Sequence, residues 1–147
     1  MEKLILERDE NDYYKLEIND NGDYIEFDLT DIGLAERVMK ASEEIDKISK
    51  DYTEKEIKIN EEIKDETEKA KQFIKLESEK DKELRKQFDS FLGEGACQKI
   101  FGNKKKYGQY ALLMDALQPH FSKMQIQMKK AKNKLAQKYL PKKNDVM

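Results

Sequence analysis

Hydrophobic and polar positions follow two different periods along this chain. Between Tyr14 and Thr30, apolar residues alternate with charged ones, and the dipeptide Asn21-Gly22 separates two such runs. Alternation with a period of two indicates strands, and Asn-Gly tolerates the positive φ angles of a tight hairpin turn. The pattern therefore predicts an N-terminal β-hairpin, to which Leu4–Leu6 would add a third strand. Since two strands are marginal alone, the hairpin must pack on another element, most simply the start of the following helix.

A helical pattern follows the predicted hairpin. From Leu34 to Leu92 the chain has 59 residues without proline or glycine, and its apolar residues recur at steps of three, four and seven. This spacing predicts a long, charged helix, with Thr30 or Asp31 as its N-cap. The apolar stripe is thin between Asp51 and Gln72. We therefore expect a frayed or broken middle, or two helices joined near residues 50–60.

Glycine residues mark the end of the long helical stretch. Four of the six glycines fall between Gly93 and Gly108, so we interpret Gly93 as a helix stop and Gly95 as a turn. A short helix should then end at Gly102, where glycine suits the C-terminal cap.

The clearest helical stripe lies in the C-terminal part of the chain. Its apolar residues are nearly in a heptad pattern: Tyr110, Leu113, Leu117, Phe121, Met124, Met128, Ala131, Leu135 and Tyr139. Pro119 should kink this helix or mark a new start near it, and Pro141 should end it.

These elements predict a mainly α fold. An N-terminal β-hairpin (1–30) precedes a long charged helix (31–92), and a short helix with the C-terminal helix (93–140) precedes a disordered tail (141–147). Long amphipathic helices joined by short connections tend to lie antiparallel, so we expect an antiparallel helical hairpin. The C-terminal helix is too short to cover 59 residues. Part of the long helix must therefore be exposed, folded back or covered by another chain.

Composition supports an extended helical protein rather than a large globular core. Charged residues make up 41% of the 147 residues and hydrophobic residues 37%. Residues 1–31 contain eleven Asp/Glu against three Lys/Arg, whereas residues 116–144 contain eight lysines and no acid. These two ends could attract each other or different partners. With no signal-peptide pattern and no apolar run of about 20 residues, we expect no membrane partner and a cytoplasmic protein.

Candidate chemistry is sparse in this sequence. One histidine, His120, and one cysteine, Cys97, have no evident catalytic partner, so we expect no enzyme, metal site or cofactor. An amide dipole at the start of the short helix could lower the pKa of Cys97, although a small buried thiol is the plainer interpretation. The Gly93-Glu94-Gly95 segment lacks the Lys-Ser/Thr of a phosphate loop.

The lysine-rich C-terminal helix raises the question of nucleic-acid binding. The candidate phosphate contacts are Lys129, Lys130, Lys132 and Lys134. Specific base recognition relies on arginine, which this helix lacks, so such binding would be non-specific. The alternatives are that the helix pairs with the acidic N-terminal segment or is simply solvated.

Four segments of the chain, in their order, are familiar: INDNGDYIEFDL (18–29), AERVMKASEEIDKI (35–48), FDSFLGEGACQKIFGNK (88–104) and YALLMDAL (110–117). They resemble a family of small uncharacterised proteins from phage and prophage tail modules of Gram-positive bacteria. The resemblance covers about half of the chain and is strongest in the third segment. It implies a tail-assembly chaperone that keeps a helical tape-measure protein soluble in the bacterial host cytoplasm, and it transfers no catalytic residues.

A chaperone of this kind needs an apolar surface for a helical partner. The candidate partner-binding residues are Phe88, Phe91, Leu92, Ile100, Phe101, Leu113 and Leu117. The alternative is that these same residues form the protein's own core. Two other functions remain open: a structural coiled-coil component of a phage particle, and a non-specific nucleic-acid-binding protein. The sequence also leaves open a homo-oligomer.

Overall fold

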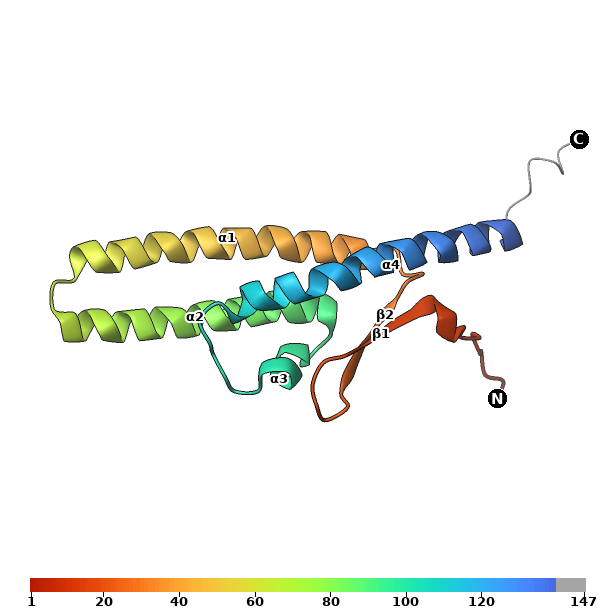
Figure 1. Cartoon of the computed structure of the whole chain (residues 1–147), viewed down its shortest axis with the longest axis horizontal. Helices are drawn as coiled ribbons and strands as arrows, with labels where there is room; N and C mark the ends of the chain where they lie inside the picture. Colours follow the sequence, from red (N-terminus) through yellow and green to blue (C-terminus); the bar gives the residue numbers. More distant parts are fainter. Residues whose placement is uncertain (140–147) are drawn as a thin grey trace, which may run out of the picture.

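Two long antiparallel helices form the body of the protein, and a third long helix packs against one end of this pair together with a β-hairpin (Figure 1). The computed structural model describes residues 1–139. In chain order the elements are a 3-10 turn η1 (Glu10–Asp12), β1 (Tyr13–Glu17), β2 (Tyr24–Asp28), α1 (Gly33–Glu62), α2 (Glu66–Leu92), α3 (Ala96–Phe101) and α4 (Gln109–Tyr139). The predicted mainly α fold with an N-terminal hairpin is confirmed.

The hairpin consists of two strands in the described part of the chain. β1 and β2 pair antiparallel, with Tyr13 opposite Asp28 and Glu17 opposite Tyr24. The predicted third strand is wrong, because Leu4–Leu6 joins no sheet and its side chains are exposed.

The connection between the strands is wider than the tight turn predicted from Asn21-Gly22. The Oδ1 atom of Asn19 accepts hydrogen bonds from the backbone N–H groups of Asn21 and Asp23, at 2.9 and 3.2 Å. This side chain organises a loop over residues 18–23, and within it only Gly22 takes a positive φ, of 83°.

The predicted alternative of two joined helices is correct, but the break lies at residues 63–65 rather than near residues 50–60. Ile63 is extended, with a ψ of 118°, and Asp65 caps α2 by accepting a hydrogen bond from the Glu68 backbone N–H at 3.3 Å. The break lies within the thin part of the apolar stripe, and residues 51–62 of that part stay helical because Tyr52 is buried against α2 and Ile59 packs beside it. The N-cap position of α1 is Ile32, and Asp31 instead accepts from the Gly33 backbone N–H at 2.9 Å.

The antiparallel helical hairpin is formed by α1 and α2, whereas the sequence pattern placed its second helix at the C-terminus. The long stretch therefore folds back on itself, which was one of the three outcomes expected for the part that the C-terminal helix is too short to cover. Figure 1 shows α4 starting beside α2 and running on past the beginning of α1. The helix continues through Pro119. Proline has no N–H group for the carbonyl one turn earlier, and because Pro119 is exposed, water can reach that carbonyl.

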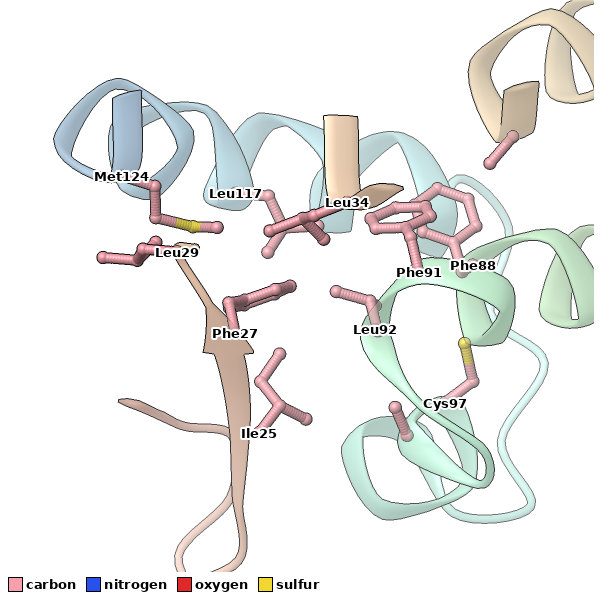
Figure 2. Packing of buried hydrophobic residues seen from close by; sticks show 12 residues of the cluster. Ile25, Phe27, Leu29, Leu34, Phe88, Phe91, Leu92, Cys97, Leu117 and Met124 are labelled. Carbon is pink, nitrogen blue, oxygen red and sulfur yellow. The ribbon is translucent and has the colours of Figure 1, made fainter. Parts of the chain in front are cut away.

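The main core lies where β2, the start of α1, the end of α2, α3 and α4 meet. Figure 2 shows Phe27 of β2 beside Leu34 of α1, Leu92 of α2 and Leu117 of α4. The hairpin therefore packs on the start of α1, as expected, and also on α2 and α4. The buried members are Ile25, Phe27, Leu29, Leu34, Ala41, Phe88, Phe91, Leu92, Ala96, Cys97, Leu117 and Met124.

Candidate functional site

An open groove lies between α1, α2 and the first turns of α4. It encloses about 1130 Å³, and the segment 105–108 lines it together with the three helices. The groove is apolar at its base and charged at its edges: Ile45, Phe73, Leu84, Phe88 and Met114 contribute apolar surface, and Asp46, Glu77, Lys80, Lys105 and Lys106 contribute charge. Acidic and basic groups are nearly balanced there. An apolar groove with charged edges suits the apolar face of an amphipathic helix.

Two large hydrophobic side chains of this groove lie in solvent. Ile74 on α2 is 72% exposed, and Tyr107, in the segment before α4, is 94% exposed. Isolated exposed hydrophobic residues are common on protein surfaces. Because these two lie at a concave apolar surface, they are the hydrophobic side chains of the groove that are most open to contact from outside.

A buried carboxylate fixes the wall of the groove where α2 meets α4. The Asp81 side chain on α2 accepts hydrogen bonds from the Tyr110 hydroxyl at 2.9 Å and from Gln109 Nε2 at 3.2 Å. Gln109 in turn accepts from the Lys106 backbone N–H at 3.0 Å. Burial, together with the bond to this carboxylate, raises the pKa of Tyr110 to about 12. The first turn of α4 is thus held by a satisfied polar network.

Arg85 extends this network to α3. Its guanidinium donates to Gln98 Oε1 at 2.8 Å and to the Gly102 carbonyl at 3.2 Å. Its Nε lies 3.9 Å from the Asp81 carboxylate. Arg85 holds the start of the loop leading to α4 at Gly102, and Asp81 holds the residues that follow the loop, Gln109 and Tyr110. These two side chains of α2 thus help to place residues 105–108 at the groove.

The structure corrects part of the predicted partner-binding set. Phe88, Phe91, Leu92 and Leu117 are buried in the main core, where Figure 2 shows them packed together with Leu34 and Phe27. Phe91, Leu92 and Leu117 do not line the groove, and Phe88 lines it but is only 1% exposed, so none of the four offers appreciable surface to a partner. The clustering of apolar residues near Gly93 reflects the meeting of five elements rather than a surface.

The other three predicted partner-binding residues are partly accessible. Ile100, Phe101 and Leu113 are half-buried and pack against the edge of the main core. Phe101 lies edge-to-face with Tyr110, with ring centroids 5.4 Å apart. None of the three lines the groove.

The four candidate nucleic-acid contacts lie on the part of α4 that extends past α1 (Figure 1). Lys129, Lys130, Lys132 and Lys134 are all exposed. Lys134 Nζ lies 2.8 Å from Asp9 Oδ2, so this lysine pairs with the acidic N-terminal segment. This pair is an instance of the predicted attraction between the two ends of the chain.

Cys97 and His120 are both used in packing. Cys97 is fully buried and burial raises the pKa of its thiol, so the favoured interpretation as a small buried thiol is confirmed and the alternative of a pKa lowered by an amide dipole is wrong. The Tyr14 hydroxyl and His120 Nδ1 form a 2.6 Å hydrogen bond that joins β1 to α4. Each residue therefore has a structural role.

The sequence pattern did not identify the groove. Asp81 is one of 31 acidic residues, and Gln109 precedes the apolar stripe of α4, so neither stands out before the fold brings them within 3.2 Å. The sequence does give a signal for Ile74. The apolar stripe needs only one of Phe73 and Ile74 to face inward, so the other is expected at the surface.

Within residues 1–139, no group of three or more His, Cys, Asp or Glu side chains is placed to hold a metal ion. No helix in the same part of the chain has the length and apolar character needed to span a membrane.

No curated protein and no solved structure matches the chain. A family of unknown function, DUF6673, matches residues 21–145, which is most of the sequence. The protein with this groove therefore belongs to the DUF6673 family.

Proposed function

We propose that this protein is a non-enzymatic chaperone or adaptor that binds an amphipathic helix of another protein. The observation that carries the proposal is the apolar groove between α1, α2 and α4, with Ile74 and Tyr107 exposed beside it. Fully burying a side chain of this size is worth about 1.5–3 kcal/mol. Two such anchors support a reversible complex, which suits a chaperone that must release its client.

The resemblance of residues 18–29, 35–48, 88–104 and 110–117 to phage tail-module proteins suggests the client. We propose a helical tail protein such as the tape measure, bound in the bacterial cytoplasm during tail assembly. A tape-measure protein is a long helical chain with exposed apolar stripes. The groove would cover part of such a stripe, and the high content of charged residues in this chain, 41%, would keep the complex soluble.

Co-expression with the tape-measure protein tests this function. The wild-type chain should raise the soluble fraction of the client, and Ile74→Glu should abolish the effect by placing a charge in the groove. Leu112→Glu is the matched control, because Leu112 on α4 is 69% exposed, close to the 72% of Ile74, but does not line the groove.

Failure of the wild-type chain to raise client solubility would overturn the chaperone proposal. Retention of the protein in purified phage particles would instead favour a structural component. An equal loss in both variants would show that the groove is not the binding surface.

A further inference from the structure

Charge is segregated between the two ends of the molecule. We define the acidic tip as residues 51–68, where α1 ends and α2 begins; it contains eight Asp/Glu and three lysines. We define the basic end as residues 121–139 of α4, which contain six lysines and no acid. Figure 1 shows the tip and the basic end at opposite ends of the long axis. They therefore cannot neutralise each other within one molecule.

Ion pairs inside the chain use little of this charge. At the basic end Lys134 pairs with Asp9, and at the tip Glu66 lies 3.8 Å from Lys69. Among residues 1–139, the remaining acids of the tip and the remaining lysines of the basic end have no ion-pair partner within 4.0 Å. Both surfaces are thus available to an opposite charge from outside.

Each surface also has an exposed apolar side chain within its charged residues. At the tip, Ile57 is 52% exposed, and Glu54 and Glu61 lie three residues before and four residues after it on the same helix face.

At the basic end the arrangement recurs with the opposite charge. Ile126 is 60% exposed and is followed at three and four residues by Lys129 and Lys130, which lie on its face of α4. The two surfaces are complementary in charge and each presents an exposed isoleucine, while the basic end also exposes Leu135 and Tyr139.

We propose that two copies of this chain associate antiparallel, with the acidic tip of each against the basic end of the other. Such a pair has two-fold symmetry and forms the same contact twice, so it closes without leaving either surface open. A nucleic acid would neutralise the lysines but leave the acidic tip without a partner. A second copy satisfies both surfaces, and this favours self-association.

Light scattering of the full-length protein at two salt concentrations tests the dimer. The wild-type chain should have the mass of a dimer at about 50 mM NaCl, and its dissociation constant should rise about tenfold or more at about 500 mM, because salt screens exposed charges. A monomer at the lower salt concentration would overturn the proposal, as would a series of larger oligomers.

Charge reversal identifies the surfaces. The double variants K129E/K130E and E54K/E61K should each be monomeric, because each places like charges opposite one another. An equimolar mixture should restore a one-to-one dimer, since the reversed surfaces are again complementary, and this rescue also shows that both variants fold. The control K99E/K104E changes the same charge at exposed positions outside both surfaces and should remain dimeric.

Two results would count against these surfaces. A dimer that survives both reversals would place the interface elsewhere. A wild-type monomer that binds DNA and releases it after K129E/K130E would assign the lysines to nucleic acid instead.

Discussion

Replacing Phe88 by alanine should destabilise the protein strongly, because this side chain belongs to the core rather than to a binding surface. Phe88 is 1% exposed, and its ring centroid lies 5.7 Å from that of Phe91 and 5.4 Å from that of Tyr110. Truncating a buried phenylalanine removes its burial and leaves a cavity, at a cost of about 3–5 kcal/mol. Ile74→Ala, at a position 72% exposed, should change the free energy of unfolding by less than about 0.5 kcal/mol.

Urea and thermal unfolding of both variants measure this difference. For a chain of this size, 1 kcal/mol corresponds to about 2–4 °C, so Phe88→Ala should lower Tm by about 6–20 °C. The m-value should stay unchanged if the loss lies in the folded state. A Phe88→Ala variant within about 1 kcal/mol of the wild type would refute the placement of this side chain in the core. The hypothesis that Phe88 binds a partner would then regain its support.

Three further predictions concern polar and titrating groups. A double-mutant cycle of Asp81→Ala and Tyr110→Phe should show a coupling in unfolding free energy of about 1.5–3 kcal/mol, because their 2.9 Å hydrogen bond involves a buried carboxylate; additive effects would contradict it. The Cys97 thiol should react with a thiol reagent at pH 8 only as fast as the protein opens, because the side chain is buried and its pKa is raised; immediate labelling of the folded protein would contradict this. Carboxyl titration by NMR should find the pKa of Asp9 below its usual 3.8, because Lys134 donates a hydrogen bond to it, and Lys134→Ala should move it back toward that value. The stabilisation from this pair is therefore present above the ordinary pKa of Asp9 and is lost as the pH falls through the lowered one.

Glycine residues in the sequence correctly predicted where α2 ends and where α3 begins and ends. Gly93 ends α2 with a φ of 120°, Gly95 precedes α3 with a φ of 77°, and Gly102 ends it with a φ of 62°. These angles suit glycine and few other residues, so its presence predicts the turns. The same logic found the hairpin, although Asn19 rather than a tight turn shapes its loop.

The break in the long helical stretch was harder to place. No proline or glycine occurs there, and although the apolar stripe is thin from Asp51 to Gln72, we expected the join near residues 50–60. The chain turns at 63–65 because Asp65 can cap a new helix, while Tyr52 still finds a buried position. A gap in periodicity weakens a helix, but a cap and a packing partner decide where it ends.

The groove shows the limit of sequence reasoning about the site. Leu84 and Phe88 on α2, Met114 on α4 and Ile45 on α1 each belong to an ordinary helical stripe. They form a concave surface only because α4 packs across one end of the α1–α2 pair.

The sequence by itself determined which segments form helices and which form the hairpin, where the glycine turns lie, and the charge difference between residues 1–31 and 116–144, because these depend on neighbouring residues. Only the tertiary structure decided which apolar residues are core and which are surface. Phe88, Phe91, Leu92 and Leu117 looked like partner-binding residues but are buried, whereas Ile74 remains in solvent. The physical reason is that an apolar stripe shows which face of a helix must be buried. The element that buries this face comes from a distant part of the chain, which the stripe does not identify.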